Sequence, residues 1–205
     1  MVLYHYTDLH LPGAEDEQED IDSWARWEQY LDHFLRIKAP LCVNTGDFCR
    51  SVPTKEIYRN IQNRLNKQEC PHLLLAGNHD DPDLMQRLLP EAQTSSYQSE
   101  WGNWKVFCFN TAEGMLRAAD LELLRKSLSQ VQKPHLVFMH HPPLFAGSLY
   151  MDCNYPLQNI NEVWPICSNS PVPLHIFCGH YHMNRVLQEN NCTVYITASP
   201  YYNID

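Results

Sequence analysis

Short apolar runs that end in clusters of His, Asp and Asn constrain the fold of this chain more than any other feature. The clearest is residues 73–80, Leu-Leu-Leu-Ala-Gly-Asn-His-Asp, where an apolar run breaks at a glycine into three polar side chains. The same layout recurs at residues 7–10, 46–47, 139–142 and 178–182. In open α/β sheets, ligands bind where loops leave the carboxyl ends of the strands. The pattern therefore predicts that several strand ends build one site.

The spacing of apolar residues predicts strands that alternate with helices and are later joined by hairpins. The predicted strands are 2–6, 41–45, 72–76, 96–101, 104–110, 136–139, 174–178, 185–188 and 194–198, and the predicted helices are 21–37, 54–66, 81–89, 118–129 and 160–166. Residues 144–156 have no clear period and are expected to form a long loop, which in a compact domain tends to be functional. The pattern predicts an α/β fold in which two mixed sheets pack face to face with helices outside. A length of 205 residues fits a single domain, residues 1–205.

The composition argues against a nucleic-acid-binding or membrane protein. The net charge is −9, whereas binding to a phosphate backbone needs a basic surface. No apolar run approaches the ~20 residues of a membrane span, and no basic leader precedes the first strand, so we expect a soluble, cytoplasmic protein. Much of the charge lies in residues 15–20, which fit a solvated loop before a helix or, alternatively, a rim that repels polyanions.

The chain has eight cysteines, none of them in a Cys-x-x-Cys pair. Several lie within or beside apolar runs, as small buried thiols do. We therefore expect reduced structural thiols rather than disulfides or a zinc knuckle.

The spacing within the polar clusters suits metal ligands. Asp8 and His10 are two residues apart, so on extended backbone their side chains point the same way, and His180 and His182 repeat this spacing. Each pair can bind one metal together or place one ligand on each of two adjacent metals. Asp47 adds a carboxylate that can bridge two metals.

Two further candidates complete the set: Asn78 offers an amide oxygen and His140 an imidazole. Seven such ligands match two metals that share one carboxylate. Histidine combined with oxygen ligands suits Mn, Fe, Zn, Co or Ni, whereas all-oxygen shells suit Mg or Ca. Each cluster alone is compatible with turn or capping chemistry, but five clusters at strand ends are hard to explain in that way.

This series resembles the calcineurin-like metallophosphoesterases. The resemblance rests on Asp8-x-His10, Gly46-Asp47, Gly77-Asn78-His79-Asp80, His140 and Gly179-His180-x-His182, which follow the family's order over nearly the whole chain. The Asp-Leu-His and Gly-His-Tyr-His forms look most like the class III cyclic-nucleotide and glycerophosphodiester phosphodiesterase branch. The resemblance implies a four-layer αββα sandwich.

The resemblance also implies a dinuclear centre of two divalent or trivalent ions, Mn, Fe or Zn. It places Asp8, His10, Asp47 and His182 on one metal and Asp47, Asn78, His140 and His180 on the other. Asp47 would then bridge the two ions. Such a pair of ions polarises a phosphoryl group and activates a hydroxide that attacks phosphorus in line.

His79 and Asp80 are the expected catalytic residues. His79 cannot easily share a metal with Asn78, because adjacent side chains diverge, and the resemblance implies that it assists the leaving group or binds phosphate. The resemblance implies that Asp80 orients His79. For His141 we expect a structural hydrogen bond, and Arg50 fits either a phosphate ligand or a surface residue.

Three functions remain open on these grounds. The first is a phosphodiesterase acting on a small diester such as a cyclic nucleotide. The second is a phosphomonoesterase on the same centre, and the third is a non-catalytic scaffold with this fold. The expected partner is a small phosphoester, while nucleic acid and membrane are not expected; the sequence leaves the oligomeric state open.

Overall fold

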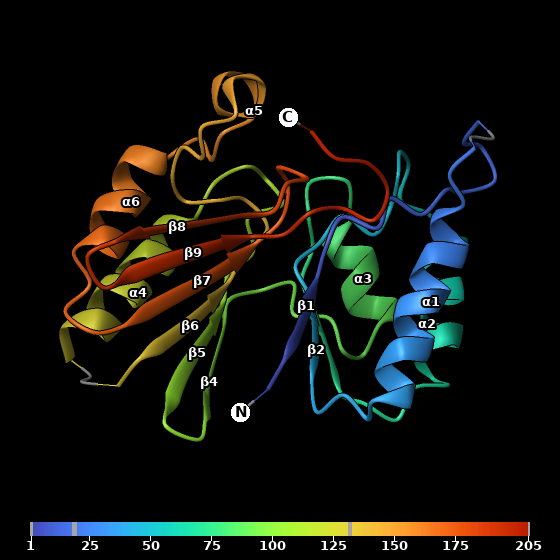
Figure 1. Cartoon of the computed structure of the whole chain (residues 1–205), viewed down its shortest axis with the longest axis horizontal. Helices are drawn as coiled ribbons and strands as arrows, with labels where there is room; N and C mark the ends of the chain where they lie inside the picture. Colours follow the sequence, from blue (N-terminus) through green and yellow to red (C-terminus); the bar gives the residue numbers. More distant parts are fainter. Residues whose placement is uncertain (1, 18–19, 131–132, 205) are drawn as a thin grey trace.

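Two β-sheets pack face to face, with helices covering both outer faces (Figure 1). The computed structural model describes residues 2–17, 20–130 and 133–204; the acidic run 15–20 thus includes two residues, 18 and 19, outside the described ranges. The strands are β1 (Tyr4–Tyr6), β2 (Cys42–Asn44), β3 (His72–Leu74), β4 (Tyr97–Trp101), β5 (Trp104–Cys108), β6 (His135–Phe138), β7 (Leu174–Cys178), β8 (Arg185–Glu189) and β9 (Cys192–Ile196). The helices are α1 (Ser23–Arg36), α2 (Lys55–Leu65), α3 (Pro82–Leu88), α4 (Ala118–Gln130), α5 (Leu149–Asn154) and α6 (Ile160–Ser168).

The strand order explains why the polar clusters share one side of the molecule. The smaller sheet has the order β1-β2-β3 and is parallel throughout. The larger has the order β4-β5-β6-β7-β9-β8, with four parallel central strands and an antiparallel strand at each edge. Parallel strands bring their carboxyl ends to the same edge of a sheet, so the loops after β1, β2, β3, β6 and β7 are neighbours.

Three apolar cores separate the four layers, as an αββα sandwich requires. Alternate residues of a strand point to opposite faces: Val43 and Leu73 pack between the sheets against Phe138, whereas Cys42 and Leu74 face α1, α2 and α3. A third core fills the space between the larger sheet and helices α4 and α6. The predicted fold class is confirmed; the smaller sheet is parallel rather than mixed.

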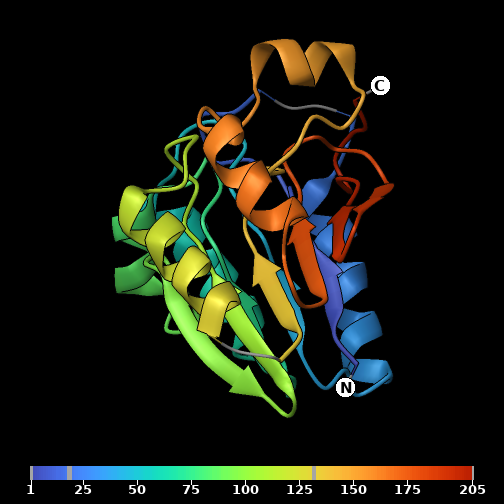
Figure 2. The same ribbon diagram turned by 90° about the vertical axis from the view of Figure 1, so that its left-hand side faces the viewer.

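Residues 144–156 differ from the prediction, because they contain helix α5 in place of a continuous loop. Its cap is Ser148, whose hydroxyl accepts a hydrogen bond from the Met151 backbone N at 3.4 Å. The Asp152 carboxylate also accepts hydrogen bonds from the backbone N atoms of residues 146 and 147. The helix has six residues and buries only Met151, so apolar periodicity could not reveal it. Figure 2 shows α5 standing above the rest of the fold, at the end where the C-terminal segment lies.

Other predicted boundaries shift by no more than two residues, and in the last hairpin both ends of one strand shift by two. Strand β9 begins at Cys192 rather than at residue 194 and ends at Ile196. Among the described residues, none of the helices is both long and apolar enough to cross a lipid bilayer.

Candidate metal centre

The seven predicted ligands meet where the loops leave five parallel strands. Asp8 and His10 follow β1, Asp47 follows β2, and Asn78 follows β3. His140 follows β6, and His180 and His182 follow β7. The first and last of these loops are joined directly, because both carboxylate oxygens of Asp8 accept hydrogen bonds from the His180 backbone N at 3.1 and 3.0 Å.

Two groups of donor atoms share one carboxylate oxygen. In the first group, His182 Nε2 lies 3.0 Å from His10 Nε2 and 3.3 Å from Asp8 Oδ1, and His10 Nε2 lies 3.7 Å from Asp47 Oδ2. In the second group, His140 Nε2 lies 3.3 Å from the same Asp47 Oδ2 and 3.0 Å from the Asn78 Oδ1 atom.

These separations fit the coordination shell of a metal ion. Adjacent donors of an octahedral ion with bonds of ~2.1 Å lie about 3 Å apart. His180 completes the second group: one of its ring nitrogens lies within 4.8 Å of donor atoms of Asp47 and His140. The donor set, imidazole nitrogen with carboxylate and amide oxygen, is one that Mn, Fe and Zn accept.

Backbone carbonyl groups fix the orientation of three of the rings. His140 Nδ1 lies 3.0 Å from the Thr45 carbonyl oxygen, and His182 Nδ1 lies 3.0 Å from that of Tyr202. His180 uses Nε2 in the same way toward Tyr155, also at 3.0 Å. Since a carbonyl oxygen only accepts, each of these nitrogens carries the proton, and the other ring nitrogen is available to bind a cation. Metal-binding histidines in proteins are held by this kind of outer contact.

Buried charge adds a second argument for cations at this site. Asp8, Asp47 and His140 are almost completely buried. Burial alone would raise the pKa of Asp47, but the nearby ring of His140 outweighs it and holds this pKa well below its usual range. Burial opposes protonation of His140 as well, yet Asp47 raises the pKa of His140 to about 9. Two buried carboxylates thus create a potential that attracts positive charge.

The backbone is unusual at five of the seven predicted ligands. Their φ angles are positive: 54° at Asp8, 45° at His10, 57° at Asp47, 64° at His180 and 50° at His182. Such angles are rare for residues other than glycine, and each costs of the order of 1–2 kcal/mol. Backbone strain of this kind concentrates at functional sites.

His79 lies beside the shared carboxylate and faces the cavity. Its backbone N donates to Asp47 Oδ1 at 2.9 Å, and its ring Nδ1 donates to the Arg50 carbonyl oxygen at 2.7 Å. The Nε2 atom is therefore the one that remains for a substrate. The orienting contact comes from a backbone carbonyl, for which the sequence carries no signal. The Arg50 side chain lies over the Tyr201 ring, 4.7 Å from its centroid, and its Nη1 donates to the Glu17 carbonyl oxygen at 3.3 Å.

Asp80 joins two neighbouring loops through its carboxylate. Its carboxylate accepts hydrogen bonds from the backbone N atoms of Phe48, Cys49 and Gly77 and from the Tyr58 hydroxyl. Burial and the charge of Asp47 raise the pKa of Asp80 to about 6. The Arg50 carbonyl thus orients the His79 ring, and Asp80 joins the loops after β2 and β3.

His141 makes the structural hydrogen bond expected of it. Its backbone N lies 3.1 Å and its ring Nδ1 3.2 Å from the Thr111 hydroxyl oxygen. Its ring packs against that of His180, with centroids 4.0 Å apart, so it supports a predicted ligand.

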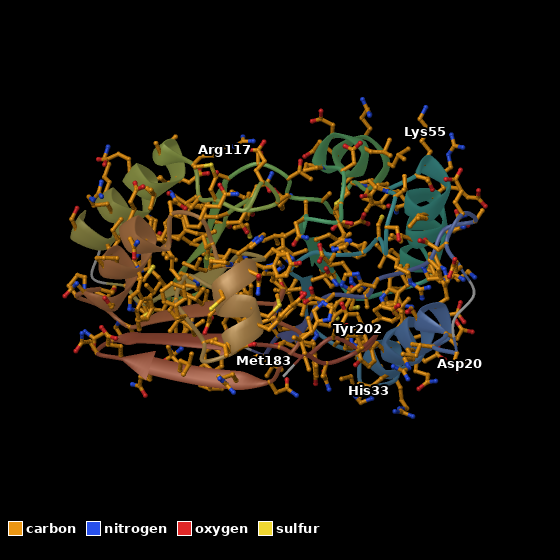
Figure 3. The ribbon with its side chains drawn as sticks, turned by 90° about the horizontal axis from the view of Figure 1, so that it is seen from above. Asp20, His33, Lys55, Arg117, Met183 and Tyr202 are labelled. Atoms are coloured by element: carbon orange, nitrogen blue, oxygen red, sulfur yellow. The ribbon has the colours of Figure 1, made fainter. Side chains whose placement is uncertain are left out.

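A cavity of about 230 Å³ opens over the centre. Its floor is formed by predicted site residues, namely His10, Asp47, Asn78, His79, His180 and His182. Its wall is formed by Tyr150, Met151 and Tyr155 in and after α5 and by Tyr202 and Ile204 in the C-terminal segment. Seen from above, Tyr202 lies near the middle of the molecule, whereas Asp20 and Lys55 lie at its outer side (Figure 3). The wall residues were missed from the sequence, because they lie in segments without periodicity.

Comparison of the sequence with models of protein families shows the family of this chain. The calcineurin-like phosphoesterase family matches residues 1–184. This chain is a member of that family. Members hydrolyse phosphoesters, and this phosphoesterase carries the family's polar clusters at adjacent strand ends.

Individual relatives agree with the family assignment. The chain is 30% identical over 205 residues to a 3',5'-cyclic-nucleotide phosphodiesterase of Nostoc, covering 95% of this chain and 75% of that protein. It is 29% identical over 204 residues to a probable cyclic nucleotide phosphodiesterase of Fibrobacter succinogenes, covering 97% and 79%. Among solved structures, a dimetal phosphatase from Danio rerio superposes with a TM-score of 0.77 at 13% identity, covering 97% of this chain and 87% of that one. This last likeness concerns the fold alone.

Proposed function

We propose that this phosphoesterase is a metal-dependent phosphodiesterase that hydrolyses a small diester such as a cyclic nucleotide. The observation that carries the proposal is the Asp47 carboxylate, one oxygen of which lies within 3.7 Å of donor atoms from both groups at the floor of a cavity. The cyclic-nucleotide phosphodiesterases to which the chain is similar over almost its whole length support the choice of a diester.

Two ions of Mn, Fe or Zn fit the donor groups. Asp8, His10, Asp47 and His182 would bind one ion, and Asp47, Asn78, His140 and His180 the other. When bound, such ions polarise a phosphoryl group and lower the pKa of a water molecule, so that hydroxide is available to attack phosphorus near neutral pH. In the imidazolium form of His79, Nε2–H would donate a proton to the leaving oxygen or a hydrogen bond to a phosphoryl oxygen, because Nδ1–H is already engaged by the Arg50 carbonyl.

The cavity favours a small substrate with a planar group. Its volume of about 230 Å³ lies below the ~300 to 1,000 Å³ that is usual for ligand pockets. Tyr150, Tyr155 and Tyr202 offer aromatic rings against which a nucleobase can stack. The net charge of −9 disfavours a polymeric polyanion.

The test combines metal analysis with two substrates. We expect about two metals per chain and Mn-dependent hydrolysis of bis(p-nitrophenyl) phosphate that exceeds hydrolysis of p-nitrophenyl phosphate. In His79→Ala the metals are retained and turnover falls ~10²–10⁴-fold, the range that general acid–base groups contribute. His33→Ala, which removes an exposed histidine on α1, is the matched control and keeps full activity.

The outcomes separate the alternatives. Turnover of the monoester alone would replace the diesterase with a phosphomonoesterase on the same centre. A protein that takes up no metal would contradict the ligand assignment and favour the non-catalytic scaffold. A third result, full activity in His79→Ala, would remove that histidine from the mechanism while leaving the metal centre in place.

A further inference from the structure

A second cluster of metal-binding atoms lies at the opposite end of the three-stranded sheet. Cys42 and His72 are the first residues of β2 and β3 and are directly paired in the parallel ladder. Cys70 lies two residues before His72. Asp47 follows the other end of β2, at the opposite edge of the sheet. The cluster is therefore separate from the proposed dinuclear centre.

The distances within this cluster fit a tetrahedral ion. The two sulfur atoms are 3.6 Å apart, and Cys70 Sγ lies 3.3 Å from His72 Nε2. All three donor atoms lie within 4.8 Å of one another. Around tetrahedral zinc, with bonds of ~2.3 Å to sulfur and ~2.05 Å to nitrogen, two sulfurs lie about 3.8 Å apart and sulfur and nitrogen about 3.6 Å apart. A disulfide needs ~2.05 Å, so no S–S bond joins the two thiols in this structure.

The remaining nitrogen of His72 has the partner that a metal-bound imidazole needs. Its Nδ1 atom lies 3.4 Å from the hydroxyl oxygen of Tyr6, on the neighbouring strand β1. With Nδ1–H donating to that oxygen, Nε2 keeps its lone pair directed toward Cys70. Contacts of this kind fix the tautomer and orientation of histidine ligands.

An open path reaches the cluster from solvent. A cavity of about 190 Å³ is lined by Cys70 together with Glu69, Lys38 and apolar residues of α1. Cys70 is half-buried, whereas Cys42 is buried beneath it. An ion can thus enter from the Cys70 side, and a fourth position can be taken by water or by a carboxylate.

We propose that Cys42, Cys70 and His72 form a zinc-binding site distinct from the catalytic centre. Binding forms two zinc–sulfur bonds and one zinc–nitrogen bond and releases the two thiol protons to solvent. Thiolate and imidazole ligands select Zn²⁺ over the hard ions Mg²⁺ and Ca²⁺. The ion ties the first residues of β2 and β3 to the loop that follows α2, and so fixes the end of the sheet that faces away from the substrate.

Cobalt titration of the reduced full-length protein tests the site. Thiolate bound to Co²⁺ gives a near-ultraviolet charge-transfer absorption, which nitrogen and oxygen ligands alone do not produce. With the dinuclear centre filled beforehand with Mn²⁺, we expect this band to saturate at one Co²⁺ per chain and to disappear when Zn²⁺ is added in equal amount. The readout is independent of catalysis, so it holds whether or not the phosphodiesterase proposal is correct.

Variants assign the band to these residues. Cys70→Ser and His72→Asn lose at least nine-tenths of it, whereas Cys153→Ser, which changes an exposed thiol on α5, keeps it. Asp47→Asn also keeps it, since that change affects only the other centre. A reduced protein without the band, or a band that persists in Cys70→Ser, would overturn the proposal. So would rapid oxidation of the pair to a disulfide in the presence of excess Zn²⁺.

Discussion

Replacing Gly77 by alanine tests how tightly the proposed bridging carboxylate is positioned. A Cβ atom at Gly77 would lie 2.1 Å from Asp47 Oδ1 and 2.4 Å from the Asp47 backbone N, whereas ordinary contacts begin at 3.4 Å. The carboxylate must therefore move by more than 1 Å, and the backbone atom cannot move cheaply. Because Asp47 faces both donor groups, both are disturbed.

The expected loss follows from that displacement. Misplacement by 1 Å can cost ~10²-fold in rate, so we expect turnover of bis(p-nitrophenyl) phosphate to fall at least a hundredfold in Gly77→Ala. Metal content falls below two per chain for the same reason. Overpacking of this kind also costs typically 1–3 kcal/mol in the free energy of unfolding.

Gly102→Ala separates loss of stability from loss of the site. Gly102 lies in the turn between β4 and β5, has a φ of +61° and has no atom within 4 Å of its Cβ position. The alanine there costs about 1–2 kcal/mol through backbone strain alone, and activity is unchanged. The assays are urea denaturation, elemental analysis and Mn-dependent turnover on both variants. A Gly77→Ala protein with two metals and activity within threefold of wild type would refute the reasoning.

Three further predictions address other parts of the site. Asp80→Asn replaces one accepting carboxylate oxygen by an NH₂ group that faces backbone N–H donors. We expect the free energy of unfolding, measured by urea denaturation, to fall by about 1–3 kcal/mol; an unchanged midpoint would contradict the loop-joining role. Burial lowers the pKa of His5 to about 4. As the pH falls, the unfolded chain therefore binds a proton at this residue before the folded chain does, so its contribution to stability is full above pH 6.5 and is lost toward pH 4. At pH 5 the loss is about 1–2 kcal/mol, and His5→Gln should flatten this part of the curve; an identical pH dependence would refute it. Tyr150→Ala should raise KM for a cyclic nucleotide ~3–10-fold, the worth of one aromatic contact, without changing turnover of bis(p-nitrophenyl) phosphate; equal effects on both substrates would argue against stacking.

The sequence predicted which polar side chains lie together because its signal is local. Each candidate ligand directly follows a strand, and parallel strands place their ends together whatever the details of packing. Asp47 and His140 could therefore be assigned to one site although they are 93 positions apart.

Features that depend on backbone atoms or on tertiary contact were out of reach. The Arg50 carbonyl that orients His79 has no side-chain signature, and Asp80 could not be seen to bind three backbone N–H groups of the adjacent loops. Helix α5 was missed because it packs a single side chain into the core. Cys42 and Cys70 are separated by a whole helix, so only the pairing of β2 with β3 reveals that their sulfurs are neighbours.

The positive φ angles at five predicted ligands have an evolutionary consequence. At His10, His180 and His182, glycine or asparagine would relieve backbone strain that the metal-free fold carries. Selection for stability alone would therefore not favour these three histidines. A lineage that no longer needed the chemistry would be free to lose them and keep the same sandwich.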